Sequence, residues 1–486
     1  MGLHTLGTSV ISFPESQQVV TSRTGLLCLW CYKYGHPRFC GVTLSTVMAP
    51  AVPRTAADIE TRTVRKIQMR LLPFMFILYI VAVLDRVNVG FAALTMNKQL
   101  AISAQQFGLL AGIFFIGYFL FEIPSNILLH KIGARIWIGR IVISWGIVSA
   151  ATAFANTATH LYIVRFLLGI AEAGFFPGMI LYLTYWFRQR EQAQAVAFFM
   201  TAQPISAIIG APISGLILDH VHWAGIPSWR WLFAVEALPA VVLGFVVFAV
   251  LPNKPENAKF LSRQEKDWLE AELEREREAK MLKGNAHASI RGALTSPRVW
   301  HLTTIYFFFI IGLYSMNFWL PTVIKAFSKL YTSTYVGMLV AVPHLCGLIA
   351  MIIISRRSDR TLERRYHAAI PAVLGGVALL FVGRMTSPVI SIGLLALMAV
   401  GIDSSFGPFW SFPGQFLTGV AAASGIALIN SIGNLGGFVG PYVIGTIAKQ
   451  TGSTAWGLAF VGVCLIIAAI LVLLLPKQRA DRQSGV

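Results

Sequence analysis

The sequence predicts an all-α membrane protein with twelve transmembrane helices, arranged as two pseudo-symmetric six-helix bundles. The chain of 486 residues is 56% hydrophobic and only 12% charged, with a mean hydropathy of +0.67, whereas soluble globular chains carry roughly 25% charged residues. Twelve stretches are apolar over about 20 residues, which is the length that crosses a hydrocarbon layer of roughly 30 Å. One long polar stretch, residues 252–298, divides them six and six. These observations exclude a soluble enzyme.

Charges, prolines and glycines bound the apolar stretches and place the predicted spans in order along the chain. The first six spans are predicted at 71–93, 107–129, 136–155, 160–186, 193–218 and 230–251. The second six are predicted at 299–324, 333–354, 366–384, 388–412, 420–447 and 454–475. We therefore expect five parts: an N-terminal extension (1–57), an N-terminal six-helix bundle (58–251), a cytoplasmic linker (252–298), a C-terminal six-helix bundle (299–476) and a cytoplasmic tail (477–486).

The linker is predicted to contain a solvated helix. Ser262 and Glu265 have the spacing of a capping box, and a charge-dense run follows through Glu278. Two six-span halves joined by a tether are the layout of transporters built from repeats, whose sites lie between the halves near the bilayer midplane.

The formal net charge of +18 is compatible with nucleic-acid binding, but the positions of the basic residues decide against it. After Met48, 28 Lys and Arg residues fall on one side of the predicted spans and six on the other. Cytoplasmic loops carry such an excess. We predict a multi-pass protein of the inner (plasma) membrane with both termini cytoplasmic, in contact with the lipid bilayer and with no nucleic acid.

The first 47 residues differ from the rest, because they hold three of the five cysteines and no uninterrupted apolar span. The spacing C-x2-C-x4-H-x3-C, one residue away from a zinc-knuckle pattern, is formed by Cys28, Cys31, His36 and Cys40. A metal site is the weaker hypothesis. We expect Met48 to be the natural start, residues 1–47 to be dispensable, and the protein to hold no metal and no cofactor.

Ionisable residues inside the predicted spans are the candidates for function. Asp85, Arg86, Arg165 and Glu172 would together cost on the order of 10 kcal/mol if they were unpaired and faced lipid. They are therefore predicted to face a cavity and to pair with one another. Arg165 and Glu172, seven residues apart, return to within about 20° of the same helix face. An ion-pair network that only locks helices together is the alternative.

The eleventh span carries a polar face. Asn430, Gly433, Asn434 and Gly437 recur at i, i+3, i+4 and i+7. The two amides are able to donate to a substrate oxygen, but the same pattern also permits close helix packing. Before this span, residues 406–413 are predicted to end the tenth span and to place an aromatic wall near the pathway.

Three stretches resemble the anion:cation symporter family of the major facilitator superfamily, over roughly residues 60–480. They read LDRVNVGFA at 84–92, FFIGYFLFEIPSN at 114–126 and RFLLGIAEAGFFPG at 165–178. The span 2 and span 4 sequences look most like the branch of permeases for tartrate-like hydroxy acids and for aromatic carboxylates such as hydroxyphenylacetate or phthalate.

The resemblance implies two six-helix bundles that rock about a central site and import a small organic anion together with protons. Arg86 would hold the substrate carboxylate, Asp85 and Glu172 would carry protons, and Arg165 would pair with an acid during gating. The positions that match the lining of the family's pocket, or supply an amide beside it, are Tyr118, Gln203, Trp410, Asn430 and Asn434.

Gate motifs of the superfamily are partly kept. Between spans 2 and 3 the motif is degenerate, with Lys131, Gly133 and Arg135 present but His130 in place of the acid. Its counterpart between spans 8 and 9 retains Asp359, Arg360 and Arg364. The second motif is thus better kept than the first, and the weakened first motif leaves open how the inner gate is locked.

The resemblance leads to the prediction of a monomeric proton-coupled symporter rather than an enzyme. A drug or metabolite efflux antiporter on the same fold stays open, because GAPISG at 210–215 is similar to the antiporter motif, although the consecutive Gly-Pro and Gly-Gly pairs are missing. A nutrient receptor that signals without transport is the third possibility, and the absence of a long predicted cytoplasmic domain counts against it.

Overall fold

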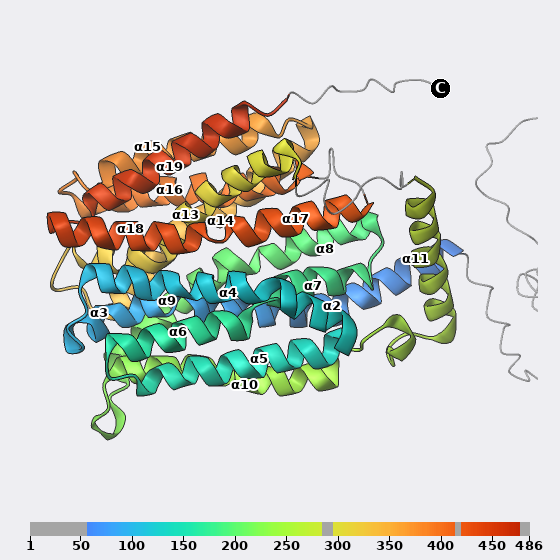
Figure 1. Cartoon of the computed structure of the whole chain (residues 1–486), viewed down its shortest axis with the longest axis horizontal. Coiled ribbons are helices and arrows are strands. Elements are labelled where there is room, and N and C mark those ends of the chain that lie inside the picture. The colour runs from blue at the N-terminus through green and yellow to red at the C-terminus, as the bar shows by residue number, and fades with distance from the viewer. Residues whose placement is uncertain (1–55, 284–294, 414–418, 477–486) are drawn as a thin grey trace, which may run out of the picture. The chain divides into compact units, whose positions relative to one another are not determined.

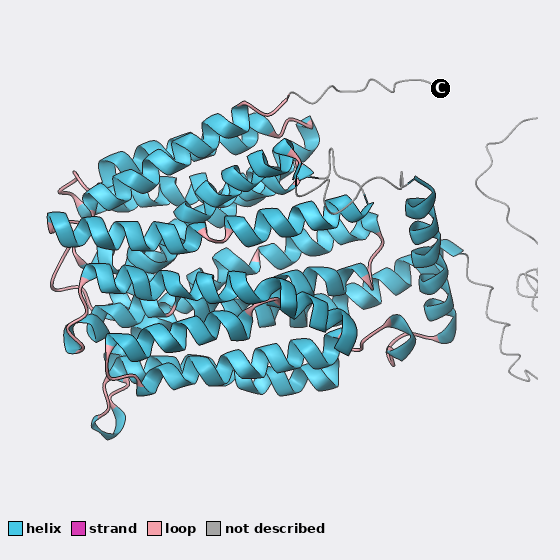
Figure 2. Ribbon diagram, in the orientation of Figure 1, coloured by secondary structure: helices cyan, strands magenta, loops and turns pink. Residues whose placement is uncertain are grey.

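The computed structural model describes residues 56–283, 295–413 and 419–476, and in these ranges the regular elements are helices joined by loops (Figures 1 and 2). Twelve helical spans within the described ranges are long and apolar enough to cross a membrane. The predicted all-α fold with twelve transmembrane helices is confirmed. The predicted domain boundaries stay predictions, and the predicted cysteine cluster at 28–40 lies outside the described residues.

The N-terminal half forms six spans. Their helices are α2 (Ala56–Val87), α3 (Val89–Gln99), α4 (Ala104–Ile132), α5 (Ala134–Ala151), α6 (Ala158–Glu172), α7 (Phe175–Thr184), α8 (Gln189–Met200), α9 (Ala202–His220) and α10 (Ser228–Val250). Local signals set several of these ends. Ser103 and Gln106 form a capping box that begins α4, and Gly133, at a φ of 96°, separates α4 from α5.

The C-terminal half forms the other six spans. Its helices are α13 (Pro297–Lys325), α14 (Ser333–Thr361), α15 (Arg365–Val382), α16 (Pro388–Trp410), α17 (Gly419–Gly433), α18 (Gly436–Thr451) and α19 (Ala455–Leu473). Proline at the first turn begins both α13 and α16, where its missing N–H costs no helical hydrogen bond. The two halves lie side by side in Figure 1.

Four of the described spans are interrupted near their middles. The breaks fall at Asn88 between α2 and α3, at 173–174 between α6 and α7, at Thr201 between α8 and α9, and at 434–435 between α17 and α18. At the second break, Gly174 has a φ of 83°, and a Cβ there would collide with the Ser125 side chain. Broken helices at membrane depth are tolerated where they line a cavity, so these breaks indicate where a site lies.

The linker helix α11 (Arg263–Lys283) lies across one end of the spans, which we call the linker end (Figure 1). Its predicted capping box is confirmed. The Ser262 backbone N–H donates to Glu265 Oε2 at 2.8 Å, and the Glu265 N–H donates to Ser262 Oγ at 3.4 Å. Glu265 also accepts from Lys66 Nζ of α2 at 2.6 Å, which ties α11 to the N-terminal half.

The two halves pack closely at the end opposite the linker. Asp219 of α9 accepts hydrogen bonds from the backbone N–H groups of Ser333 at 3.0 Å and Thr334 at 2.7 Å, and so caps the N-terminus of α14. A Cβ at Gly108 would lie 2.5 Å from the carbonyl oxygen of Pro441 in α18. Only glycine therefore lets α4 and α18 approach this closely, and the opposite end is closed.

Glu265→Gln is expected to loosen α11 from α2. Burial alone would raise the pKa of the Glu265 carboxyl, but hydrogen bonds from Lys66 and Ser262 outweigh it and hold the pKa below its usual value. The tether is therefore present above roughly pH 4 and is lost as the pH falls further. Losing one partly exposed charged hydrogen bond costs about 1 kcal/mol, so amide exchange in α11 should accelerate about fivefold by hydrogen-exchange mass spectrometry.

Glu270→Gln is the matched control for this prediction. Glu270 is exposed on the same helix. An equal acceleration of exchange in both variants would show that the contact between Lys66 and Glu265 does not hold α11.

Candidate functional site

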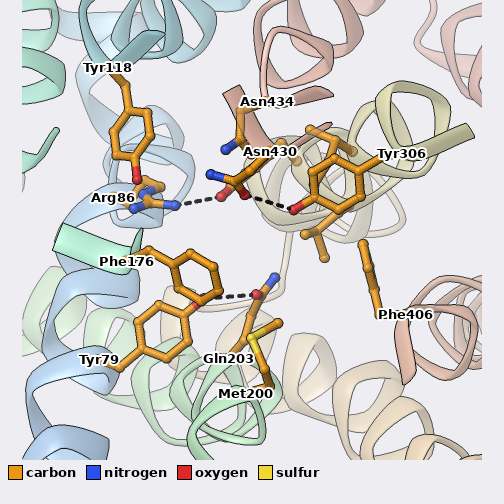
Figure 3. A pocket seen from close by; sticks show the side chains of 13 residues that line it. Tyr79, Arg86, Tyr118, Phe176, Met200, Gln203, Tyr306, Phe406, Asn430 and Asn434 are labelled. Atoms are coloured by element: carbon orange, nitrogen blue, oxygen red, sulfur yellow. Dashed lines mark hydrogen bonds between the residues drawn. The ribbon is translucent and has the colours of Figure 1, made fainter. Parts of the chain in front are cut away.

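A small cavity lies between the two halves, beside the helix breaks. It encloses about 30 Å³ and is lined by Tyr79, Arg86, Tyr118, Phe176, Met200, Gln203, Tyr306, Ile310, Leu313, Tyr314, Phe406, Asn430 and Asn434. Figure 3 shows Arg86 and Tyr118 on one side of this space and Asn430, Asn434 and Tyr306 on the other. The space holds about one water molecule, whereas sites for small organic ligands measure roughly 300–1,000 Å³. In this conformation the cavity is therefore too small to hold a small organic ligand.

Arg86 is the cation of the cavity. Its Nη2 forms an ion pair with Glu172 Oε1, and its Nη1 donates to the Tyr314 hydroxyl of the other half at 2.5 Å. Both charged side chains are almost fully buried, with Arg86 7% and Glu172 1% exposed. The guanidinium carbon lies 5.2 Å and 5.6 Å from the ring centroids of Phe114 and Tyr118. A buried charge needs such partners, and the rings add cation–π attraction.

Arg165 lies next to this ion pair and does not join it. Its side chain is fully buried, and Nη2 donates to the backbone carbonyl oxygen of Arg86 at 2.8 Å. Nε and Nη1 have no hydrogen-bond partner among the described residues. A Cβ at Gly169 would collide with the carbonyl oxygen of Phe114, so this glycine lets α6 pack against α4. Arg165 thus holds the backbone at Arg86 in place, and two of its guanidinium nitrogens have no hydrogen-bond partner among the described residues.

Asp85 points away from the cavity although it precedes Arg86 in the chain. Its carboxyl oxygens accept from Trp145 Nε1 at 3.0 Å and from Ser149 Oγ at 2.9 Å, both on α5. The residue is 1% exposed. A buried carboxyl held by neutral donors carries a large desolvation cost when it is ionised, which suits a group that binds a proton.

The predicted substrate-binding residues divide into two groups. Arg86, Tyr118, Gln203, Asn430 and Asn434 line the cavity. Trp410 is not among the lining residues and packs edge-on against Tyr306, with ring centroids 5.0 Å apart. The aromatic wall predicted before span 11 is therefore represented in the cavity by Phe406, with Trp410 as a supporting contact.

The predicted gate residues lie at the linker end. Arg364 forms an ion pair with Asp359 and donates from Nη1 to Ser358 Oγ at 3.1 Å. The first motif makes a different set of contacts, because the backbone N–H of Arg135 donates to Asn253 Oδ1 at 2.9 Å. Of the remaining members, Gly133 ends α4, and the exposed side chains are Lys131 and Arg360.

Several cavity residues were not predicted. Tyr79, Tyr306 and Tyr314 supply hydroxyl groups and ring faces, and nothing in the spacing of aromatic residues distinguishes them from the many other aromatics of the spans. Glu122 of α4, which does not line the cavity, was also not predicted, although it is an ionisable residue inside an apolar stretch. The rule that selected Asp85, Arg86, Arg165 and Glu172 would also have selected it.

Metal binding is not indicated in this part of the chain. Among the described residues, no group of three or more His, Cys, Asp or Glu side chains is placed to hold a metal ion. The cavity instead presents one guanidinium, two amides beside it and a glutamine opposite, together with tyrosine hydroxyls. Such a set has the chemistry to bind an anion that carries hydrogen-bonding groups or a flat ring.

Comparisons with known proteins agree with this description. The sequence model of the Major Facilitator Superfamily matches residues 75–441. The chain is 49% identical to a "Putative tartrate transporter" of Agrobacterium vitis over 430 residues, covering 88% of this chain and 98% of the relative. It is 41% identical to a "Quinolone resistance transporter" of Acinetobacter baumannii, covering 88% and 98%.

A solved structure shares the fold. It is a bacterial homologue of the human lysosomal transporter Spinster in an inward-facing, occupied conformation, with a TM-score of 0.68 and 13% sequence identity. The match covers 84% of this chain and 96% of that one.

Proposed function

Because the chain belongs to the major facilitator superfamily, it is a membrane transport protein and not an enzyme, and we propose that it is a proton-coupled symporter. The proposed substrate is a hydroxy- or aromatic carboxylate, imported across the inner membrane by alternating access. The observation that carries the proposal is the buried ion pair between Glu172 and Arg86, which lines the cavity between the halves.

The guanidinium of Arg86 is suited to bind a substrate carboxylate. It already binds one carboxylate, that of Glu172, and it is held in place by the Tyr314 hydroxyl. Arginine presents a planar pair of donors that matches the two oxygens of a carboxylate. In our proposal the substrate replaces Glu172 at Arg86, and the halves separate to make room for it.

Proton coupling follows from this replacement. Glu172 loses its cation when the substrate arrives, and an unpaired carboxylate in a buried site is costly. Binding a proton removes that cost. Asp85, held by Trp145 and Ser149, supplies a second proton site in the same half. With the charges neutralised, the occluded state crosses the low-dielectric barrier at lower cost, and opening toward the cytoplasm releases substrate and protons.

The lining supports the proposed substrate class. Gln203, Asn430 and Asn434 offer amides to hydroxyl groups or to a second carboxylate, while Tyr306 and Phe406 offer ring faces to an aromatic acid. A relative named as a tartrate transporter, at 49% identity over most of both chains, supports hydroxy acids first.

The direction of transport rests on the orientation in the membrane. The excess of Lys and Arg on the side of the linker places the linker end in the cytoplasm. In this proposal the closely packed opposite end faces the periplasm.

Efflux of a drug is the second candidate function. It is favoured by the 41% identity to a relative named as a quinolone resistance transporter. A quinolone carries a carboxylate of its own, which could replace Glu172 at Arg86, so the uptake assay and not the site separates this function from the first.

Uptake into proteoliposomes separates these functions. Purified protein is reconstituted, and labelled L-tartrate, phthalate, hydroxyphenylacetate and a fluoroquinolone are each offered with an acidic exterior and with no gradient. We expect one of the carboxylates to accumulate only under the gradient, and a protonophore to abolish the accumulation. The Arg86→Ala variant serves as the control for leakage and for binding to lipid.

Each of the other possible results would assign a different function to this protein. Quinolone movement against its gradient, with no carboxylate flux, would establish efflux. Binding of a carboxylate without any flux would indicate a receptor, and carboxylate uptake that ignores the pH gradient would contradict the proposed coupling.

A further inference from the structure

Glu122 joins the two halves through a buried carboxyl that the proposed mechanism does not use. Asn430 Nδ2 donates to Glu122 Oε1 at 2.7 Å, and Ser431 Oγ donates to Glu122 Oε2 at 2.7 Å. Glu122 belongs to α4 in the N-terminal half, and its partners belong to α17 in the C-terminal half. The residue is 2% exposed. Both oxygens of the carboxyl are thus held by the opposite half.

The contact lies on the linker side of the cavity. Glu122 follows the cavity residue Tyr118 by one helical turn, in the direction of the linker end, where α4 finishes at Ile132. Asn430 itself lines the cavity, and Figure 3 shows its side chain between the two halves. Access to the cavity from the linker end requires α4 and α17 to part, and parting them breaks both hydrogen bonds.

The donors to Glu122 are neutral, and no ion-pair partner of Glu122 lies among the described residues. The charged side chains on the helices packed against α4, among the described residues, are Lys98, Arg135, Arg140, His160, Arg165, Glu172 and Lys449, with His130 and Lys131 on α4 itself. Arg86 attracts the Glu122 carboxylate through space, and Tyr118 and Tyr306 are the titratable hydroxyls that interact with it. Arg86, however, is already paired with Glu172.

Protonation changes the strength of this contact. Hydrogen bonds to an ionised carboxylate are roughly twice as strong as bonds between neutral groups. A protonated Glu122 keeps one acceptor for Asn430, but its other oxygen becomes a donor and its bonds lose the contribution of the charge. Burying the charge, however, costs more than these stronger hydrogen bonds return, because desolvation of the buried carboxyl outweighs them. The protonated form therefore holds α17 against α4 more tightly than the ionised form does.

We propose that Glu122 is a proton-controlled latch, which keeps the linker side of the cavity closed when it is protonated and lets that side open when it is ionised. The proposed function supplies the purpose, since the proton-loaded carrier would stay closed on the linker side until the proton is released to the less acidic cytoplasm. Glu122 is a positioning residue in this scheme, because it acts on the two halves and not on the substrate.

The distance between the linker ends of α4 and α17 tests the latch without any substrate. Spin labels are placed at Ile132 and Ile426, which are both exposed, in the full-length chain with its five cysteines replaced. Distance distributions are recorded in lipid nanodiscs at about pH 8 and about pH 5.5. We expect the longer-distance population to shrink roughly tenfold relative to the shorter one as the pH falls.

Three variants make the result decisive. Glu122→Gln, which resembles the protonated acid, should show little of the longer-distance population at either pH value and lose most of the pH response. Asn430→Ala, which removes a donor, should enlarge that population at about pH 5.5. Glu236→Gln should respond like the wild type, since Glu236 is a buried acid whose partner, Ser214 at 2.6 Å, lies in the same half.

A wild-type response that persists at full size in Glu122→Gln would overturn the proposal. So would distributions that do not change with pH in the wild type. Neither outcome depends on which anion is transported, so failure of the latch is distinguishable from failure of the proposed function.

Discussion

Arg86→Lys is expected to weaken substrate binding by tenfold or more and to abolish measurable uptake, although the positive charge is kept. Arg86 uses two separate nitrogens at once, Nη2 toward Glu172 and Nη1 toward the Tyr314 hydroxyl at 2.5 Å. A compact ammonium cannot span both positions or grip two carboxylate oxygens in one plane. Losing one charged hydrogen bond costs about 1.5–3 kcal/mol, which is roughly 10- to 100-fold in affinity.

Equilibrium binding of labelled L-tartrate to purified protein measures this loss. Arg140→Lys is the control, because Arg140 lies on α5 outside the cavity and stacks on Trp137 at 4.0 Å. Unchanged affinity in Arg86→Lys would place the anion elsewhere. Arg165, with two guanidinium nitrogens that lack partners among the described residues, would then be the next candidate.

Glu172→Gln is expected to keep exchange of substrate across the membrane and to lose accumulation driven by a pH gradient. Glutamine resembles the protonated acid in shape and charge, so Arg86 is left free to bind the anion. Exchange needs no release of a proton, whereas net uptake requires the empty carrier to give its proton back. Accumulation should fall to the level of the no-gradient control, while exchange stays within a few-fold of the wild type.

Measuring both activities in the same proteoliposomes separates coupling from structure. If the ion pair of Arg86 and Glu172 only locks helices together, the variant should insert poorly and lose exchange and accumulation together. Glu236→Gln, a buried acid outside the cavity, controls for the removal of a buried charge. Accumulation at the wild-type level in Glu172→Gln would remove Glu172 from the coupling mechanism and leave Asp85.

The transmembrane architecture was predictable because it depends on hydropathy averaged over many residues. Apolar stretches of sufficient length, bounded by charges and turns, predicted the twelve spans. The polar stretch between the sixth and seventh spans predicted the linker with its capping box at Ser262. The breaks within spans were not predicted. The break at Gly174, for example, depends on one backbone conformation and on contact with Ser125, and the hydropathy of the span does not report it.

The sequence predicted most of the residues that form the site, but it did not predict which of them contact one another. Arg86 and Glu172 were selected because charged residues are rare in apolar stretches. The sequence placed Glu172 on the same helix face as Arg165, whereas the structure pairs Glu172 with Arg86 on another helix. Asn430 was expected to face a substrate oxygen, and its amide is held by Glu122 instead. Pairings of this kind depend on helix positions that no local pattern encodes.

Proton uptake on substrate binding tests the central claim, that the anion takes the place of Glu172 at Arg86 and the freed carboxyl binds a proton. L-tartrate, or the anion that the uptake panel selects, is added to purified protein in weakly buffered solution with a pH indicator. The account predicts uptake of about one proton per anion bound in the wild type and the loss of that proton in Glu172→Gln. Binding without proton uptake in the wild type, or equal uptake in both proteins, would contradict it.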